Sequence, residues 1–193
     1  GKTTFLNALS AYIPKGERII TIEDNAELQI QGVENLVRLE AKEANLESGT
    51  EITIRDLIRA ALRMRPNRVI IGEVRGAETF ELLSAFNTGH AGSLSTAHAN
   101  SVKDMISRLE TMVLMGVQLP LEAIRRQIAS GIEILVHLGR GEDGSRRVEE
   151  IAEITGMEED EIKTVSLFRR EYGRGLQKTG ELVHREKLEG KTG

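Results

Sequence analysis

The 193-residue sequence contains no cysteine, few aromatic residues and no long apolar run. Without cysteine, disulfide scaffolds, thiolate metal sites and cysteine nucleophiles are excluded. No apolar run approaches the roughly 18 residues that a membrane-spanning helix requires. The net charge of −4 provides no overall basic field for nucleic acid or anionic lipid. A hydrophobic fraction of 39% is nevertheless too high for intrinsic disorder, so the sequence predicts a folded globular chain.

Short apolar segments alternate with amphipathic segments over most of the chain. We expect helices over residues 3–13, 54–65, 77–88, 101–113 and 120–130, and strands over 18–22, 36–39, 69–74, 93–96 and 132–138. This alternation is typical of an α/β fold with a mostly parallel sheet and helices on both faces. The segments 146–154 and 162–172 instead predict a C-terminal antiparallel addition. We therefore expect one domain over residues 1–172 and a polar, Gly-rich, disordered tail over 173–193.

Polar residues follow three of the predicted strands at the point where each strand ends. Glu23 and Asp24 follow one strand, Glu73 ends another, and His98 follows a third. Ligands of open α/β sheets bind beyond the carboxyl ends of the strands, so these residues could converge on one site. Glu73 could orient or deprotonate a water that attacks a γ-phosphate. The alternative is a structural glutamate that pairs with Arg75.

The other polar residues at the strand ends leave alternatives open. Side chains of the adjacent acids Glu23 and Asp24 point in opposite directions if the backbone is extended. We expect Glu23 to reach a Mg²⁺ ion and Asp24 to be a turn residue. The small-residue run Gly89–Ser101 contains His90 and His98. Since no cysteine and no third ligand accompany them, a hydrogen bond to phosphate is favoured over zinc binding, and a structural role is equally open for His90.

The chain begins with Gly1-Lys2-Thr3-Thr4 at the start of a predicted amphipathic helix. Gly-Lys-Thr is the second half of the phosphate-binding motif G-x-x-x-x-G-K-[ST]. In that motif, backbone N–H groups and the lysine bind phosphates while the hydroxyl holds Mg²⁺. The alternative is a solvated amino terminus. Because no methionine precedes the motif, we interpret the chain as a fragment, which we expect to fold but not to hydrolyse ATP at a useful rate.

Together these motifs resemble those of the type II/type IV secretion ATPase superfamily. The corresponding stretches are Gly1–Thr4 for the P-loop, 21–28 for an acidic box, 69–76 for a Walker B strand ending in Gly-Glu, and Gly89–Ser101 for a histidine box. Stretches at 51–57, 61–66 and 107–115 are similar to the branch that assembles tight-adherence (Tad/Flp) pili, often called CpaF-like. The resemblance covers roughly residues 1–170.

The resemblance implies a RecA-like P-loop NTPase core that couples hydrolysis of ATP, with Mg²⁺, to movement of pilin or another substrate. It also implies a homo-oligomeric, hexameric ring, located in the cytoplasm at the inner face of the cell membrane and bound to an inner-membrane platform protein. By residue, it implies nucleotide binding by Gly1, Lys2, Thr3 and Thr4, metal binding by Thr3 and Glu23, and catalysis by Glu73, Glu23 and His98.

Two other functions were weighed against this motor. A non-catalytic ring subunit or inactive fragment could use the same fold for assembly, although the presence of Glu73, Glu23 and His98 favours an active site. A RecA-like nucleic-acid motor is disfavoured by the acidic balance and by the lack of aromatic or basic stripes. The arginines on and after the helix at 54–65 are explained either by a solvated helix face or by phosphate or interface contacts, with an interface favoured for Arg63 and Arg65.

Overall fold

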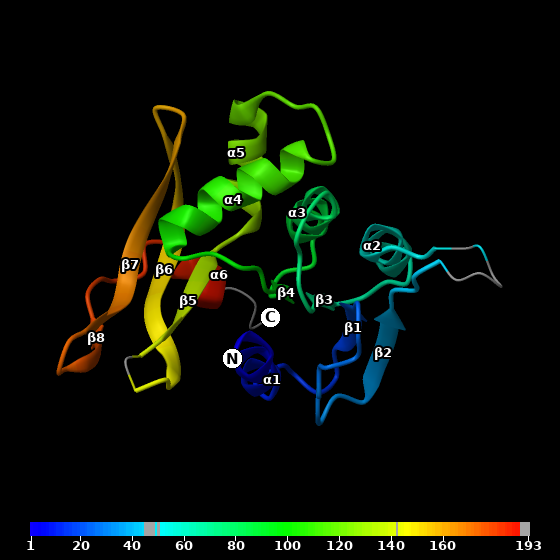
Figure 1. Cartoon of the computed structure of the whole chain (residues 1–193), viewed down its shortest axis with the longest axis horizontal. Helices are drawn as coiled ribbons and strands as arrows, with labels where there is room; N and C mark the ends of the chain where they lie inside the picture. The colour runs from blue at the N-terminus through cyan, green and yellow to red at the C-terminus, as the bar shows by residue number, and fades with distance from the viewer. Residues whose placement is uncertain (45–48, 50, 142, 190–193) are drawn as a thin grey trace. The chain divides into compact units, whose positions relative to one another are not determined.

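The computed structural model describes residues 1–44, 49, 51–141 and 143–189, which form two compact units (Figure 1). The first unit holds Gly1–His98 and Thr111–Gln118, and the second holds Ala99–Glu110 and the residues from Leu119 onward. Helix α4 (Val102–Leu114) contributes residues to both units. Among the described residues, no helix combines the length and the apolar character needed to cross a bilayer.

The first unit contains a four-stranded parallel sheet. Its strands lie in the order β2 (Asn35–Glu40), β1 (Arg18–Glu23), β3 (Arg68–Ile71) and β4 (Leu94–Ser95). The β-branched runs predicted to be buried are buried, and Ile20, Ile22 and Ile71 have no exposed surface. The expectation of an α/β fold with a parallel sheet is thus confirmed. Because the strands are parallel, the residues after β1, β3 and β4 lie at one edge.

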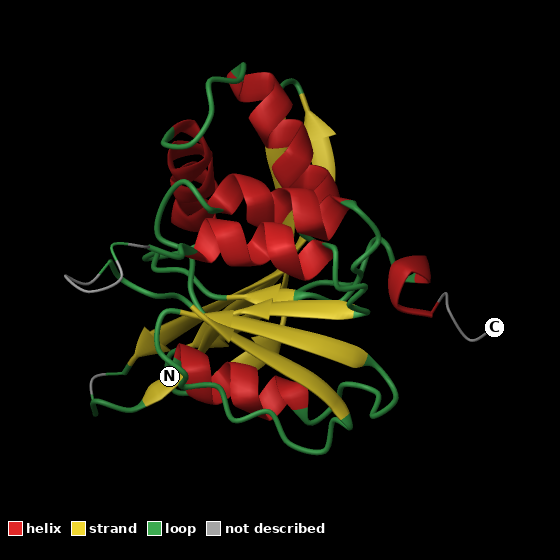
Figure 2. Ribbon diagram, turned by 90° about the vertical axis from the view of Figure 1, so that its right-hand side faces the viewer, coloured by secondary structure: helices red, strands yellow, loops and turns green. Residues whose placement is uncertain are grey.

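Helices accompany this sheet. Helix α1 (Lys2–Ser10) buries Leu6 in a cluster with Ile19 and Ile70 of the sheet, and it is the helix next to the label N in Figure 2. Helices α2 (Ile54–Leu62) and α3 (Thr79–Asn87) contact each other, and α2 also contacts β1. The first turn of α2 is closed by the predicted capping box. Its hydrogen bonds with Thr53 lower the pKa of Asp56.

The second unit contains an antiparallel sheet, which confirms the expected addition. Its order is β5 (Ile134–Arg140), β6 (Arg146–Glu158), β7 (Glu161–Glu171) and β8 (Gly175–Lys178). Helix α5 (Leu121–Gly131) contacts β6 and β7. Arg125 on α5 donates to Oε1 of Glu110 at 2.7 Å and to the carbonyl oxygen of Asp160 at 2.9 Å. These bonds tie the helix to α4 and to the β6–β7 turn.

The segment after Gly173 differs from the expected disordered tail. Strand β8 extends the sheet, and α6 (Glu186–Glu189) follows it. The carboxylate of Glu153 on β6, with 2% of its surface exposed, accepts the N–H groups of Val183 at 2.7 Å and His184 at 2.8 Å. The composition of this segment gives no sign of that distant acceptor. The end of the expected tail, residues 190–193, lies outside the described residues.

Candidate active site

The carboxyl edge of the parallel sheet brings together three residues from distant parts of the sequence. Nζ of Lys2, the first residue of α1, lies 3.1 Å from Nε2 and 3.3 Å from Nδ1 of His98. The same Nε2 lies 3.0 Å from Oε1 of Glu73, just beyond the end of β3. Lys2, His98 and Glu73 therefore form one contiguous polar cluster at the edge where ligands of α/β sheets bind.

The two carboxylate oxygens of Glu73 have different surroundings. Oε2 accepts a hydrogen bond from Arg75 at 3.1 Å. Oε1 is buried and lies 3.0 Å from Nε2 of His98, an ion pair when that ring is protonated, and among the described residues it accepts no hydrogen bond. A buried acceptor without a donor is unfavourable and uncommon in folded proteins. This oxygen is thus suited to accept a hydrogen bond from a ligand or a water molecule.

The backbone around Glu73 is held by the two neighbouring strands. On one side, the N–H of Gly72 donates to the carbonyl oxygen of Ile22 at 2.8 Å. On the other side, Oγ1 of Thr96 donates to the carbonyl oxygen of Gly72 at 2.6 Å, while the carbonyl oxygen of Thr96 accepts the N–H of Val74 at 2.9 Å. Thr96 therefore contacts the residues that immediately precede and follow Glu73.

Arg75 is the charged partner of Glu73, as the structural alternative for that glutamate anticipated. The hydrogen bond to Glu73, and then the negative charge of Glu73, raise the pKa of Arg75. Asp24 and Glu78 raise this pKa further through their negative charge, with smaller effects. Asp24 itself is exposed after the end of β1. The guanidinium therefore remains a permanent positive charge on one oxygen of the Glu73 carboxylate.

Glu23, expected to support the metal, is buried, with 6% of its surface exposed. Its Oε1 accepts the backbone N–H groups of Glu27 and Leu28, each at 2.9 Å. A Cβ at Gly72 would lie only 3.0 Å from Cγ of Glu23, so a larger residue at position 72 would crowd this side chain. The carboxylate expected to support the metal thus holds the loop that follows its own strand.

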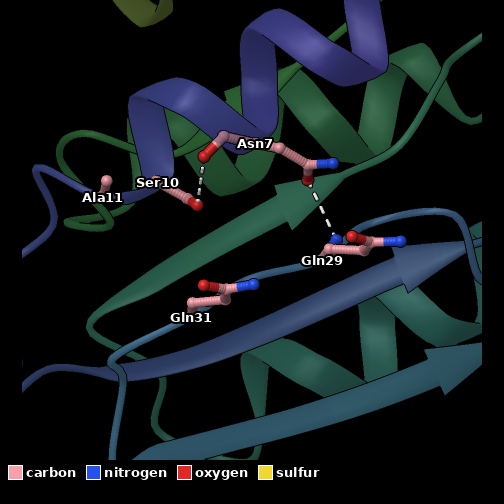
Figure 3. Close-up of a pocket in the computed structure, with 5 residues that line it drawn as sticks. All are labelled: Asn7, Ser10, Ala11, Gln29 and Gln31. Atoms are coloured by element: carbon pink, nitrogen blue, oxygen red, sulfur yellow. Dashed lines mark hydrogen bonds between the residues drawn. The ribbon is translucent and has the colours of Figure 1, made fainter.

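Glu27, to which the sequence assigned no role beyond membership of the acidic box, is the acid beside the P-loop threonine. Its Oε2 accepts a hydrogen bond from Oγ1 of Thr3 at 3.3 Å. The loop that contains Glu27 makes a second contact with α1, because Oδ1 of Asn7 accepts the N–H of Gln29 at 2.9 Å (Figure 3). The only sequence signal was the position of Glu27, four residues after Glu23 in a polar loop.

The pocket in Figure 3 is separate from this cluster. Its lining residues are Asn7, Ser10, Ala11, Gln29 and Gln31. Ser10 ends α1, eight residues after Lys2, which corresponds to about 12 Å along the helix axis. Oγ of Ser10 donates to the carbonyl oxygen of Asn7 at 2.7 Å. We attribute the pocket to the packing of the 24–31 loop on α1.

The amino end of α1 is suited to bind an anion. Gly1 is the N-cap and is exposed, Thr4 is exposed, and the described residues provide neither a side-chain cap nor an acid in the first turn. Helix amino termini attract phosphates through their N–H groups, and the charge of Lys2 adds to that attraction.

The residues beside α1 also fit a divalent cation. Among the described residues, no group of three or more His, Cys, Asp or Glu side chains could hold a metal ion. Mg²⁺ does not require one, because it is usually bound through one or two protein oxygens together with waters and substrate phosphates. The Thr3 hydroxyl and the Glu27 carboxylate provide such oxygens side by side.

Three other candidate residues lie away from the cluster. Arg63 and Arg65 are exposed and precede the amino end of β3, the opposite end of the strand from Glu73. Arg65 has a φ of 54°, a left-handed conformation that is uncommon outside glycine. Nδ1 of His90 lies 3.1 Å from the carbonyl oxygen of Ala85 near the end of α3, a structural contact.

The family model described as "Type II/IV secretion system protein" matches residues 1–169. The chain belongs to this family. VirB11 of the Brucella suis type IV secretion system is 40% identical over 152 residues, which are 76% of this chain and 42% of VirB11. The crystal structure of that VirB11 ATPase in complex with sulphate matches 78% of this chain and 44% of VirB11, with 37% identity and a TM-score of 0.69.

Two further relatives extend the comparison. A Mycobacterium tuberculosis protein named for conjugal transfer is 41% identical over 173 residues, 90% of this chain and 48% of that protein. The pilus retraction motor PilT with bound ADP matches 76% of this chain and 39% of PilT, with 25% identity and a TM-score of 0.50. The chain spans about half the length of the curated relatives it matches. With these secretion ATPases it shares the RecA-like fold.

Proposed function

We propose that this chain is the motor domain of a secretion or pilus-assembly ATPase, which couples ATP hydrolysis to movement of a pilin or other substrate across the membrane. One observation carries the proposal: Glu73, with a buried oxygen that lacks a hydrogen-bond donor among the described residues, contacts His98 and, through it, Lys2. The sulphate of the VirB11 structure and the ADP of PilT support nucleotide binding by this fold.

Binding of the nucleotide falls to the start of α1. Its first N–H groups, from Gly1 to Thr4, and the Lys2 ammonium hold the phosphates. The Thr3 hydroxyl and the Glu27 carboxylate hold Mg²⁺, which, when bound, neutralises phosphate charge during hydrolysis. Glu23, earlier expected to be a metal ligand, acts through the loop: its carboxylate fixes the N–H of Glu27 and thereby keeps that side chain beside Thr3.

Catalysis falls to Glu73 and His98. Oε1 of Glu73, which accepts no hydrogen bond from the described residues, accepts a proton from the attacking water, while Arg75 donates a hydrogen bond to Oε2. In the present arrangement the Lys2 ammonium contacts the His98 ring. When Lys2 turns to the phosphates, the exposed His98 ring is released to donate a hydrogen bond to the γ-phosphate. His98 thus reports the γ-phosphate to the carboxylate that it contacts.

The assembly is proposed by analogy with the family. We place residues 1–172 in the motor domain of a homo-oligomeric, hexameric ring in the cytoplasm, at the inner face of the membrane and bound to an inner-membrane platform protein. Stretches 51–57, 61–66 and 107–115 favour the tight-adherence pilus branch. Arg63 and Arg65, exposed at the edge opposite the cluster, are placed in a subunit interface.

The test is steady-state phosphate release with Mg-ATP by the longest natural polypeptide that contains this sequence, called the natural polypeptide below. We expect Lys2→Ala to lower turnover by about 100-fold or more, the scale of losing a preorganised donor to transition-state charge. Lys15→Ala, an exposed lysine beyond α1, is the matched control and should stay within about twofold. Nucleotide binding without hydrolysis would favour the non-catalytic ring subunit, and hydrolysis insensitive to Lys2→Ala would contradict the proposed site.

A further inference from the structure

Glu78, at the N-cap position of α3, makes an unusual set of hydrogen bonds. Its Oε1 accepts the backbone N–H of Arg75 at 2.5 Å and that of Gly76 at 3.0 Å. An acidic side chain near a helix start commonly accepts N–H groups of the first turn. Here, within the described residues, no side-chain cap is formed on α3, and the carboxylate points backward. The Glu78 carboxylate therefore binds backbone N–H groups of the preceding loop and not those of its own helix.

That loop is the segment through which the chain leaves Glu73. On its strand side, Thr96 already fixes Gly72 and Val74. Beyond Val74 the chain must turn away from the sheet toward α3, and Gly76 in this turn is buried. Since a buried N–H without an acceptor is costly, the Glu78 carboxylate stabilises this particular course of the turn.

Helix α3 gives Glu78 a fixed base. Glu81, in the first turn of α3, is 5% exposed. Its Oε1 accepts hydrogen bonds from Arg55 at 2.6 Å and Arg59 at 2.7 Å, both on α2. These two ion pairs of the buried Glu81 carboxylate link the first turn of α3 to α2. A side chain from an anchored helix can hold a loop in place, whereas one from a mobile segment cannot.

The loop in turn carries the groups around the catalytic carboxylate. Arg75, whose N–H is bound by Glu78, donates through its guanidinium to Oε2 of Glu73 at 3.1 Å. A shift of the Arg75 backbone would move the guanidinium and release Oε2. The Glu73 carboxylate could then rotate, and Oε1 would no longer face the His98 side of the cluster.

We propose that Glu78 is a positioning residue for catalysis: it fixes the Arg75–Gly76 backbone and thereby the orientation of the Glu73 carboxylate. The inference rests on the proposed role of Glu73 as general base. Glu78 touches neither nucleotide nor water in this account. Misplacement of a catalytic group by about 1 Å lowers the rate by up to about 100-fold.

The first test compares Glu78→Ala with Glu78→Gln in the natural polypeptide. Both N–H groups bind the same oxygen, Oε1, and the glutamine amide retains an acceptor oxygen. We expect Glu78→Ala to lower kcat about 10- to 100-fold with KM for ATP within about threefold. Glu78→Gln should restore kcat to within about threefold. Glu122→Ala, an exposed acid on α5, is the control for loss of a surface carboxylate. Equal loss in the alanine and glutamine variants would overturn the proposal.

A second measurement separates positioning from general damage. We compare the single-turnover rate of ATP hydrolysis in the Glu73→Gln variant with that in the Glu73→Gln, Glu78→Ala double variant. The second substitution should lower this rate by less than about threefold, because the carboxylate that Glu78 orients is already absent. An effect as large as in the unaltered background would contradict action through Glu73. If Glu78→Ala does not fold, Glu78→Asp, which withdraws the carboxylate by one methylene, takes its place with the same expectation.

The two proposals fail in different ways. Wild-type turnover in Glu73→Gln alone would refute the role of Glu73 and the proposed function with it. A disabled Glu73→Gln variant together with unchanged kcat in Glu78→Ala would refute only the role of Glu78.

Discussion

Glu73 follows β3 in the first unit, and Glu153 lies within β6 in the second. The carboxylate oxygens of these two glutamates differ in their hydrogen-bond partners. Both oxygens of Glu153 accept backbone N–H groups, Oε1 from His184 and Oε2 from Val183. Glu73 has one oxygen bound to Arg75 and one buried oxygen without a hydrogen-bond partner among the described residues.

In the proposed function, the difference separates a carboxylate that stabilises the fold from one that takes part in the reaction. Burial of a charged group is tolerated when its own chain satisfies it, and Glu153 meets this condition. An acceptor left open lowers stability, and such sites persist where a ligand or a reaction uses them. The same residue type therefore predicts opposite consequences of mutation at the two positions.

Glu73→Gln gives the largest expected effect, because the amide cannot accept the proton of the attacking water. Turnover of the natural polypeptide should fall by about 100-fold or more while ATP affinity changes little. Phosphate release and equilibrium nucleotide binding measure the two quantities. Glu40→Gln, an exposed acid at the end of β2, should leave both unchanged. Turnover within a few-fold of wild type would remove Glu73 from catalysis.

Glu153→Ala tests the other side of the comparison. It leaves the N–H groups of Val183 and His184 without their acceptors, each at a cost of about 1–3 kcal/mol, so the free energy of unfolding should fall by about 2–6 kcal/mol. Urea unfolding followed by far-ultraviolet circular dichroism suits a chain without tryptophan. Glu161→Ala, an exposed acid on β7, should change this energy by less than about 0.5 kcal/mol. Equal effects of the two variants would contradict the structural role.

His98→Ala sharpens the assignment of the polar cluster. A hydrogen bond to a charged γ-phosphate contributes about 1.5–3 kcal/mol, and ADP lacks that group. The affinity for ATP should therefore fall about 10- to 100-fold more than the affinity for ADP. Titration calorimetry in the Glu73→Gln background, where ATP persists, measures both. Equal weakening of the two nucleotides would assign His98 a structural role.

His184 gives the smallest effect. The hydrogen bond to the carbonyl oxygen of Thr155 raises the pKa of His184, and Glu186 raises it further with a smaller effect. Desolvation and the positive charge of Lys187 act in the opposite direction. Because the folded pKa lies above the unfolded value of about 6.5, protonation of His184 stabilises the fold below that pH. This stability is lost as the pH rises through the folded pKa.

The melting temperature of the unaltered chain should accordingly exceed that of His184→Gln at about pH 5.5, and this difference should shrink by about pH 8.5. A difference that grows with pH, or a His184 pKa below 6.5 measured by nuclear magnetic resonance, would contradict the assignment.

The strands and helices that local sequence could predict were those with strong periodicity. The runs around Ile20 and Ile70 are rich in β-branched residues, and they form the buried centre of the sheet. The convergence of Glu73 and His98 could also be anticipated, because parallel strands place their ends at one edge.

Contacts made by side chains across loops could not be predicted in the same way. Glu23 and Glu27 are equally acidic in sequence, and only the loop geometry decides which lies on Thr3 and which binds backbone. Glu78 reads as an ordinary residue at a helix start until its backward hydrogen bonds are seen. Strand β8 depends on pairing with β7, and the residues after β8 depend on Glu153, a buried acceptor about 30 residues away in β6; local composition records neither.

The most direct test is the free energy of unfolding after the same Glu→Gln change at positions 73 and 153. Glu73→Gln weakens the ion pairs of Glu73 with Arg75 and His98, whose side chains are both largely exposed, so the free energy of unfolding should stay within about 1 kcal/mol of the unaltered chain. Glu153→Gln turns an N–H₂ group toward a backbone donor and should lower it by about 2 kcal/mol or more. A loss at position 73 as large as the loss at position 153 would contradict the claim that Glu73 is kept for catalysis and not for the fold.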